Sequence, residues 1–145
     1  MENDKTFVPG LACLLGYAGL IPFVVLSASV FFVDNELRPS SVFALRVYAA
    51  CIASFLGAIY WGLVMKAAAP ASAALMWGIT PSLLAFAALL VGPVPGLTMI
   101  TAVLWLCYFV DRVGYPGFGL GHWLRMRLAL TTIASLSCLS PLALT

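Results

Sequence analysis

Four charged residues in the second half of the chain are the best candidates for chemistry. Asp111 and Arg112 follow one apolar segment, and Arg125 and Arg127 stand where the next one begins. A helix dipole disfavours cations at its N-terminal end, so Arg125 and Arg127 need a partner. We favour anionic lipid headgroups as that partner. The alternative is an ion pair of Asp111 with either arginine, which would tie two helix ends together.

A polar stripe continues from Arg127 into the last apolar segment. Thr131, Ser135 and Cys138 follow it at helical spacing. Such side chains usually bond a helix carbonyl or a neighbouring helix, and a polar path along a cavity is the alternative.

The residue types give little support for a metal site or for covalent catalysis. The chain has 4 cysteines, each in a different apolar segment, and 1 histidine, His122. This distribution is unlike the clustered ligands of a zinc or iron–sulfur site, so we predict no metal and interpret the thiols as small buried hydrophobes. We find no convincing acid–base or nucleophile pair, so we expect no enzymatic activity, and any cofactor stays undefined.

Tyr60 and Trp61 stand out among the aromatic residues because they flank a run of small residues in an apolar segment. They could form the floor of an apolar pocket for a flat molecule such as a quinone, a sterol or a tetrapyrrole. Thr80 and Tyr108 are the other polar side chains that could line such a pocket. These four residues are the candidate ligand-binding set.

Composition places the chain in lipid. Hydrophobic residues make up 63% of it and charged residues 8%, which is far from soluble averages. The net charge of +2 comes without a basic stripe, so nucleic acid is not an expected partner. We read the apolar run after the first residues as a retained membrane helix and not as a signal peptide, because it is too long for one.

The apolar segments predict an all-α fold, a polytopic helical bundle of five transmembrane helices forming a single domain over 1–145. The predicted helices cover about 9–33, 41–66, 72–91, 93–111 and 122–142. Pro22 and Pro81 predict kinks. The fourth helix is short for a bilayer, so a re-entrant segment is the alternative there. Basic residues gather on the N-terminal side, which predicts a cytoplasmic N-terminus.

Small residues repeat at helical spacing and predict close helix packing. In the second helix they form two ladders: Ala50, Ser54, Ala58 and Gly62, and beside it Ala49, Ala53 and Gly57 leading to Trp61. The predicted packing residues are Gly16, Gly19, Ser54, Gly57, Ala58, Gly62 and Gly78. The second helix should therefore be central to the bundle.

Four segments in order carry a family resemblance. They are GYAGLIPF (16–23), SFLGAIYWG (54–62), WGITPSLLAF (77–86) and, after Asp111, HWLRMRLALT (122–131). Together they resemble the small membrane proteins related to transmembrane protein 69, a domain-of-unknown-function family of bacteria and mitochondria. The resemblance implies a helical bundle in a bacterial inner or mitochondrial membrane and supplies no established activity. The family pattern has histidine where this chain has Tyr60, so a proton or metal role there would not carry over unchanged.

Two functions remain from the sequence. The favoured one is a structural or accessory subunit that packs through its small-residue faces against other subunits of a larger membrane complex. The alternative is a binder or carrier of a small apolar ligand, including a lipid, between the helices.

Overall fold

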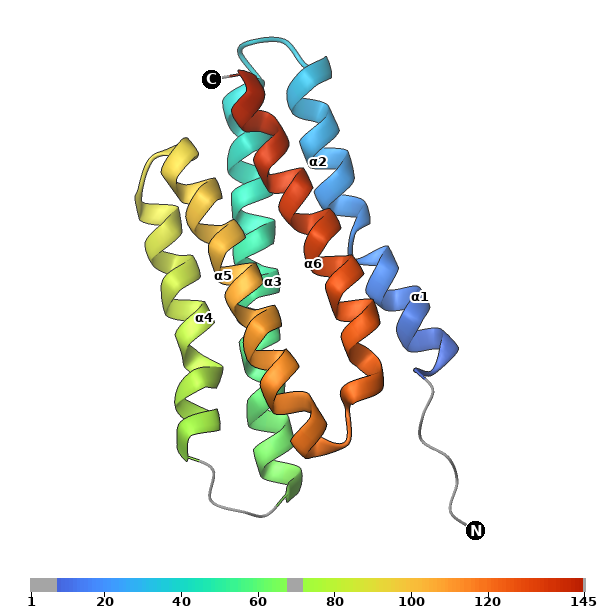
Figure 1. The fold of residues 1–145 in the computed structure, drawn as a ribbon. Coiled ribbons are helices and arrows are strands. Elements are labelled where there is room, and N and C mark those ends of the chain that lie inside the picture. Colours follow the sequence, from blue (N-terminus) through green and yellow to red (C-terminus); the bar gives the residue numbers. More distant parts are fainter. Residues whose placement is uncertain (1–7, 68–71, 145) are drawn as a thin grey trace.

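A computed structural model describes residues 8–67 and 72–144, and within them the chain is built of helices without any strand (Figure 1). Of the predicted domain over 1–145, residues 1–7, 68–71 and 145 lie outside the described residues. The α-helices are α1 (Gly10–Ala18), α2 (Ile21–Phe32), α3 (Arg38–Ala67), α4 (Ser72–Leu90), α5 (Pro93–Gly114) and α6 (Leu124–Leu139). Short 3-10 helices follow α5 (η1, Tyr115–Phe118), precede α6 (η2, Gly121–Trp123) and follow α6 (η3, Ser140–Leu144).

Five stretches of these helices are long and apolar enough to cross a membrane, which confirms the predicted fold class. The fourth is not short, because α5 has 22 residues and η1 extends it to Phe118. At 1.5 Å per residue, α5 alone spans about 33 Å, enough for a hydrocarbon core of about 30 Å. The helix continues past Asp111, where the sequence predicted its end.

The first membrane segment is broken and not merely kinked. Helix α1 ends at Ala18 and α2 begins at Ile21, so Pro22 lies in the first turn of α2, where its missing N–H is harmless. The Tyr48 hydroxyl of α3 donates to the Gly19 carbonyl in this break at 2.8 Å. The predicted discontinuity at Pro22 is therefore present, and α3 supplies a hydrogen bond to the exposed backbone.

Helices α3 and α4 approach each other at two glycines. A methyl group added to Gly57 would lie 2.5 Å from the Gly78 carbonyl oxygen and 3.1 Å from Pro81. The Trp61 indole lies over Gly78, and its Nε1 donates to the Leu75 carbonyl at 3.1 Å. Only glycine fits at these two positions. This contact therefore holds the inner ladder of α3 (Ala49, Ala53 and Gly57) against α4 at Gly57.

The outer ladder of α3 (Ala50, Ser54, Ala58 and Gly62) is buried within the bundle only at Ala50. Ala58 and Gly62 are exposed, and a methyl group at Gly62 would meet no atom within 4 Å. Ser54 is half-buried and donates to the Ala50 carbonyl of its own helix at 3.0 Å. The two ladders point in different directions around the helix, and α4 covers the inner one.

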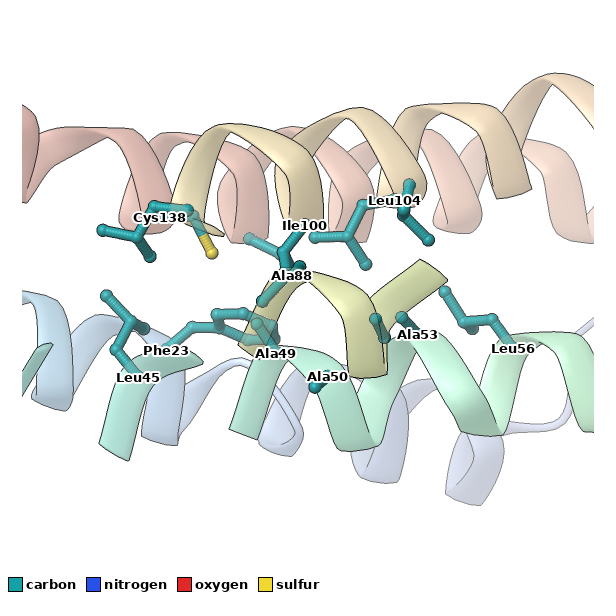
Figure 2. Close-up of a cluster of buried hydrophobic side chains, with 14 of the residues drawn as sticks. Phe23, Leu45, Ala49, Ala50, Ala53, Leu56, Ala88, Ile100, Leu104 and Cys138 are labelled. Carbon is teal, nitrogen blue, oxygen red and sulfur yellow. The ribbon is translucent and has the colours of Figure 1, made fainter. Parts of the chain in front are cut away.

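The buried core lies between α3 and the helices around it. Figure 2 shows Ile100 and Leu104 pointing toward the helix that carries Ala49 and Ala53. Leu45, Ala49, Ala53 and Ile100 are all 0% exposed, so small residues on α3 meet larger ones on α5 without leaving space. This interlocking makes α3 central to the bundle, as the ladders predicted.

Arg46 fixes the other end of the α3–α4 contact. Its Nη2 atom donates to the carbonyl oxygens of Ala88 at 2.7 Å, Leu89 at 3.2 Å and Val91 at 2.6 Å. Ala88 and Leu89 belong to the last turn of α4 and Val91 directly follows the helix, so these carbonyls have no intrahelical donors. Arg46 therefore caps the C-terminal end of α4, where the helix dipole favours a cation.

Candidate functional site

A buried ion pair joins α5 to α6 at the end of the bundle where the first of these helices ends and the second begins (Figure 1). Arg127 donates to the Asp111 Oδ2 atom from Nε at 2.8 Å and from Nη2 at 2.5 Å. Asp111 is 2% exposed and Arg127 is 6% exposed. Charged groups inside a membrane protein are expensive and mark functional sites by default, so this pair anchors the candidate site.

The connection between the two helices brings the charges together. Helix α5 carries Asp111 one turn before its end, and the chain returns through η1 and η2 to begin α6 at Leu124. Gly119 makes the turn with a φ of 72°, a left-handed conformation that favours glycine. The glycine-rich segment thus acts as a tight return that places Arg127 beside Asp111.

Two tyrosines surround the pair. Tyr60 and Tyr115 are both 3% exposed, their ring centroids are 6.2 Å apart, and both hydroxyls lie near the Asp111 carboxylate. The Tyr60 hydroxyl makes no hydrogen bond of ordinary geometry within the described chain. Gly114 gives this hydroxyl its room, because an added methyl group would lie 2.6 Å from it. Asp111 is therefore enclosed by one cation and two phenols.

An apolar cavity of about 160 Å³ lies next to Arg127. It is lined by residues of α1, α2, α3, α5 and α6, among them Gly16, Phe23, Ile52, Leu104, Arg127 and Thr131, and it is partly open to the surroundings of the bundle. Gly16 also lets α6 approach closely, since the Met126 methyl carbon would lie 3.3 Å from an added Cβ. The cavity is thus an apolar chamber with a polar side formed by α6.

Two buried hydroxyl groups of α6 lack a hydrogen-bond partner among the described residues. Thr131 is 3% exposed and Ser135 is 4% exposed, and neither Oγ atom has a hydrogen-bond partner among the described residues. The neighbouring Thr132 behaves ordinarily, because its hydroxyl donates to the Leu128 carbonyl at 2.9 Å. The predicted stripe therefore faces inward, but its hydroxyls do not make the carbonyl bonds that we expected of them.

The structure separates the four charged candidates. Arg112 and Arg125 are exposed, whereas Asp111 and Arg127 are buried together. Headgroup contact, the partner that the sequence favoured for both arginines of α6, is wrong for Arg127. Arg125 and Arg127 lie on nearly opposite faces of α6 because they are two residues apart, so only one of them can reach Asp111.

The four candidate ligand-binding residues do not converge. Tyr60 lies beside the ion pair, whereas Trp61 packs on Gly78 at the α3–α4 contact. Thr80 donates to the Met76 carbonyl of its own helix at 3.0 Å, and Tyr108 packs its ring against Trp105 with centroids 5.8 Å apart. The cavity is lined by other residues than these four.

The cysteines are not uniformly buried, which corrects the sequence-based interpretation. Cys107 and Cys138 are buried, Cys13 is half-buried and Cys51 is exposed. Within residues 8–67 and 72–144, no group of three histidine, cysteine or acidic side chains could hold a metal ion.

Residues 8–143 match a protein family described as a protein of unknown function (DUF3429). The chain belongs to this family. The match includes every residue of the ion pair and of the cavity lining. No curated protein and no solved structure matches the chain. Membership in DUF3429 assigns no activity, so the site itself has to supply the argument for function.

Sequence reasoning missed the cavity and the role of Arg46. The cavity lining runs from Leu15 to Ala134, and no local pattern connects such distant residues. A signal for Arg46 did exist, since an arginine inside an apolar helix needs a partner. The partners are backbone carbonyls, which the side-chain pattern does not reveal.

Proposed function

We propose that this multi-pass membrane protein binds a small apolar ligand in the cavity between α1, α2, α3, α5 and α6. The observation that carries the proposal is the cavity of about 160 Å³ directly beside a buried ion pair. Apolar chambers with a few polar groups are typical small-molecule sites, and they occur between the helices of bundles. Arg127 belongs to both the ion pair and the cavity lining, and its bonds to Asp111 hold it in place.

The test is the melting temperature of the protein in mild detergent with and without butylbenzene, since a ligand that binds only the folded state stabilises it. Ile52 lines the cavity, so Ile52→Trp should fill it and abolish the rise in melting temperature. Ile59→Trp is the matched control, because Ile59 is another half-buried isoleucine of α3 that does not line the cavity. An equal rise in wild type and Ile52→Trp would contradict the proposal.

A second function, an accessory subunit of a larger membrane complex, is favoured by the uncovered outer ladder of α3. A groove of about 430 Å³ between α3 and α4 is lined by Cys51, Ser54 and Ser82 among others, and Ala58 lies exposed further along α3. Small residues facing outward allow the backbone of a partner's transmembrane helix to approach closely.

The accessory function is tested by the size of the complex after gentle extraction from its native membrane. Ala58→Phe should reduce that size to the monomer without changing the melting temperature. Ala102→Phe places the same bulk on an exposed position of α5 and should leave the complex intact. A wild-type protein that is recovered as a monomer would overturn this function.

Location and orientation belong to the same proposal. The resemblance to transmembrane protein 69 leads us to propose a bacterial inner or mitochondrial membrane, and the distribution of basic residues leads us to propose a cytoplasmic N-terminus. Among the described residues, Lys66, Arg112, Arg125 and Arg127 belong to the proposed inner side, and Arg38 and Arg46 to the other. A reporter fused after Thr145 should be active outside the cytoplasm, and activity only inside would reverse the assignment.

A further inference from the structure

The cavity beside Arg127 opens to the outside of the bundle between α1 and α3. Leu15 of α1 and Phe55 of α3 both line it, and each is 63% exposed. Both residues lie within stretches long and apolar enough to span a membrane, Gly10–Phe32 and Arg38–Ala67, so the surroundings of the opening are lipid. An apolar molecule dissolved in the bilayer therefore has a direct lateral route to the cavity.

Helix α1 forms one side of this opening and is held loosely. None of its nine residues is buried, and Leu11, Leu14 and Leu15 are 67%, 67% and 63% exposed. It lies against α6 at Gly16, where an added methyl group would be 3.3 Å from the Met126 methyl carbon. An element with few buried contacts has low local stability, so we expect α1 to separate from the bundle more readily than the other helices.

Helix α2, which continues the same membrane segment, is held firmly. Its side chains Phe23 and Val30 are each 1% exposed. The Ser27 and Ser140 hydroxyls hydrogen-bond to each other, which ties α2 to η3. The first membrane segment therefore has a loose half, α1, and a fixed half, α2.

The two halves meet at a break in the helical hydrogen bonds. Gly19 and Leu20 separate α1 from α2, and Pro22 has no N–H to donate to the Ala18 carbonyl. The Tyr48 hydroxyl holds the Gly19 carbonyl at 2.8 Å, so the link stays against α3 when α1 turns about it. A few residues between two elements, held in place while one element moves, are the usual form of a hinge.

From the loose helix, the hinge and the opening, we propose that α1 is a lateral gate of the cavity. It turns about Gly19 and Leu20, moves away from Met126 and widens the opening beside Phe55. An apolar ligand then passes between the bilayer and the cavity. The inference rests on the proposed function, because it assigns the route by which the ligand enters.

The movement of α1 is measured by the distance distribution between two spin labels in mild detergent, without ligand. One pair joins α1 to α4 through Leu14→Cys and Phe86→Cys, and the control pair joins α2 to α4 through Val25→Cys and Phe86→Cys. These positions are 67%, 62% and 57% exposed in the order Leu14, Phe86 and Val25, so the labels leave the interior intact. Cys13 and Cys51, the native thiols that are not buried, are replaced by alanine. The α1 pair should give a distribution about two-fold wider than the α2 pair, because α1 samples open and closed positions.

A thiol inside the cavity tests whether this movement controls access. Ala134 lines the cavity and is 4% exposed, so Ala134→Cys reacts with N-ethylmaleimide only when the reagent enters. Peptide mass spectrometry follows the reaction. Gly16→Val adds bulk against α6 and should raise the rate about 10-fold, because overpacking destabilises the closed position alone. Gly10→Val is the matched control, since an added methyl group at Gly10 meets no atom within 4 Å. Cys138, which is buried and does not line the cavity, reports a general loosening of the bundle.

The two measurements separate the outcomes. Equal widths for the two spin-label pairs, or the same rate at position 134 with and without Gly16→Val, overturn the gate and leave the proposed function intact. An equal rise in the rate at Cys138 also overturns it, because the whole bundle would then be opening. The spin-label pairs decide the question even where Gly16→Val does not fold. The proposed function is tested separately by the melting temperature with butylbenzene, which needs no movement of α1.

Discussion

The two buried arginines of this bundle lie at opposite ends and have different partners: the Arg46 Nη2 atom meets backbone carbonyls while its Nε has no partner among the described residues, and Arg127 meets a carboxylate. Arg46, at the end where α4 stops, donates to three backbone carbonyls and meets no carboxylate within the described structure. Arg127, at the end where α6 begins, meets the carboxylate of Asp111. Arg46 thus caps a helix terminus, whereas Arg127 balances the charge of the Asp111 carboxylate.

The two arginines also differ in what surrounds them. Arg46 sits between α3, α4 and the start of α5, where Gly96 makes room for it, since an added methyl group would lie 2.5 Å from its Nη2 atom. No cavity residue is among its partners. Arg127 is itself part of the cavity lining. Arg46 contacts mainly backbone atoms, and Arg127 borders the apolar cavity.

The largest effect is expected where a charge loses its partner. Asp111→Asn leaves Arg127 buried without a carboxylate, which should lower the free energy of unfolding by about 3–5 kcal/mol. The measurement is a denaturation titration in mixed detergent micelles. Asp34→Asn, at an exposed turn, is the control and should change little. A stable Asp111→Asn protein would show that the pair is not needed to hold α5 to α6.

A smaller effect is expected at the other end. Arg46→Met removes the donor to three carbonyls but leaves no buried charge, so the free energy of unfolding should fall by about 1–3 kcal/mol. The same titration measures it, with Arg112→Met on the surface as the control. Should Arg46→Met cost more than Asp111→Asn, the distinction between a capping and a charge-pairing arginine would fail.

The smallest effect concerns the tyrosine beside the pair. Tyr60→Phe removes a hydroxyl that interacts with Asp111 but makes no ordinary hydrogen bond within the described chain. We expect a change in unfolding free energy within about 1 kcal/mol. Exposed Tyr17→Phe serves as the comparison in the same assay. A loss as large as that of Asp111→Asn would mean that Tyr60 is an essential partner of the carboxylate.

Much of the fold could be predicted from the sequence. Apolar length sets the five spans, and Pro22 marks the break because proline has no N–H to continue a helix. The inner ladder at Gly57 was predicted as a packing face, and it is one. The outer ladder at Ala58 and Gly62 has the same composition, so only the position of α4 in space decides which ladder is covered.

Less of the candidate site could be predicted from the sequence. The charged residues were identified, but Arg125 and Arg127 are only two positions apart, and the orientation of α6 about its own axis decides which of them faces α5. The cavity arises where α1 and α2 meet α3, α5 and α6, so it depends on long-range packing. Thr131 looks like Thr132 in the sequence, and only the structure shows that one lacks a partner.

A double-mutant cycle of Asp111 and Arg127 tests the central claim most directly, namely that these residues form one charge-balanced unit. The unfolding free energies of Asp111→Asn, Arg127→Gln and the double variant are compared with that of the wild type. We expect each single variant to lose about 3–5 kcal/mol. The double variant should lose less than the sum of the two by about 2–3 kcal/mol. Losses that simply add would show that the two charges act independently, which would contradict a charge-balanced pair beside the cavity.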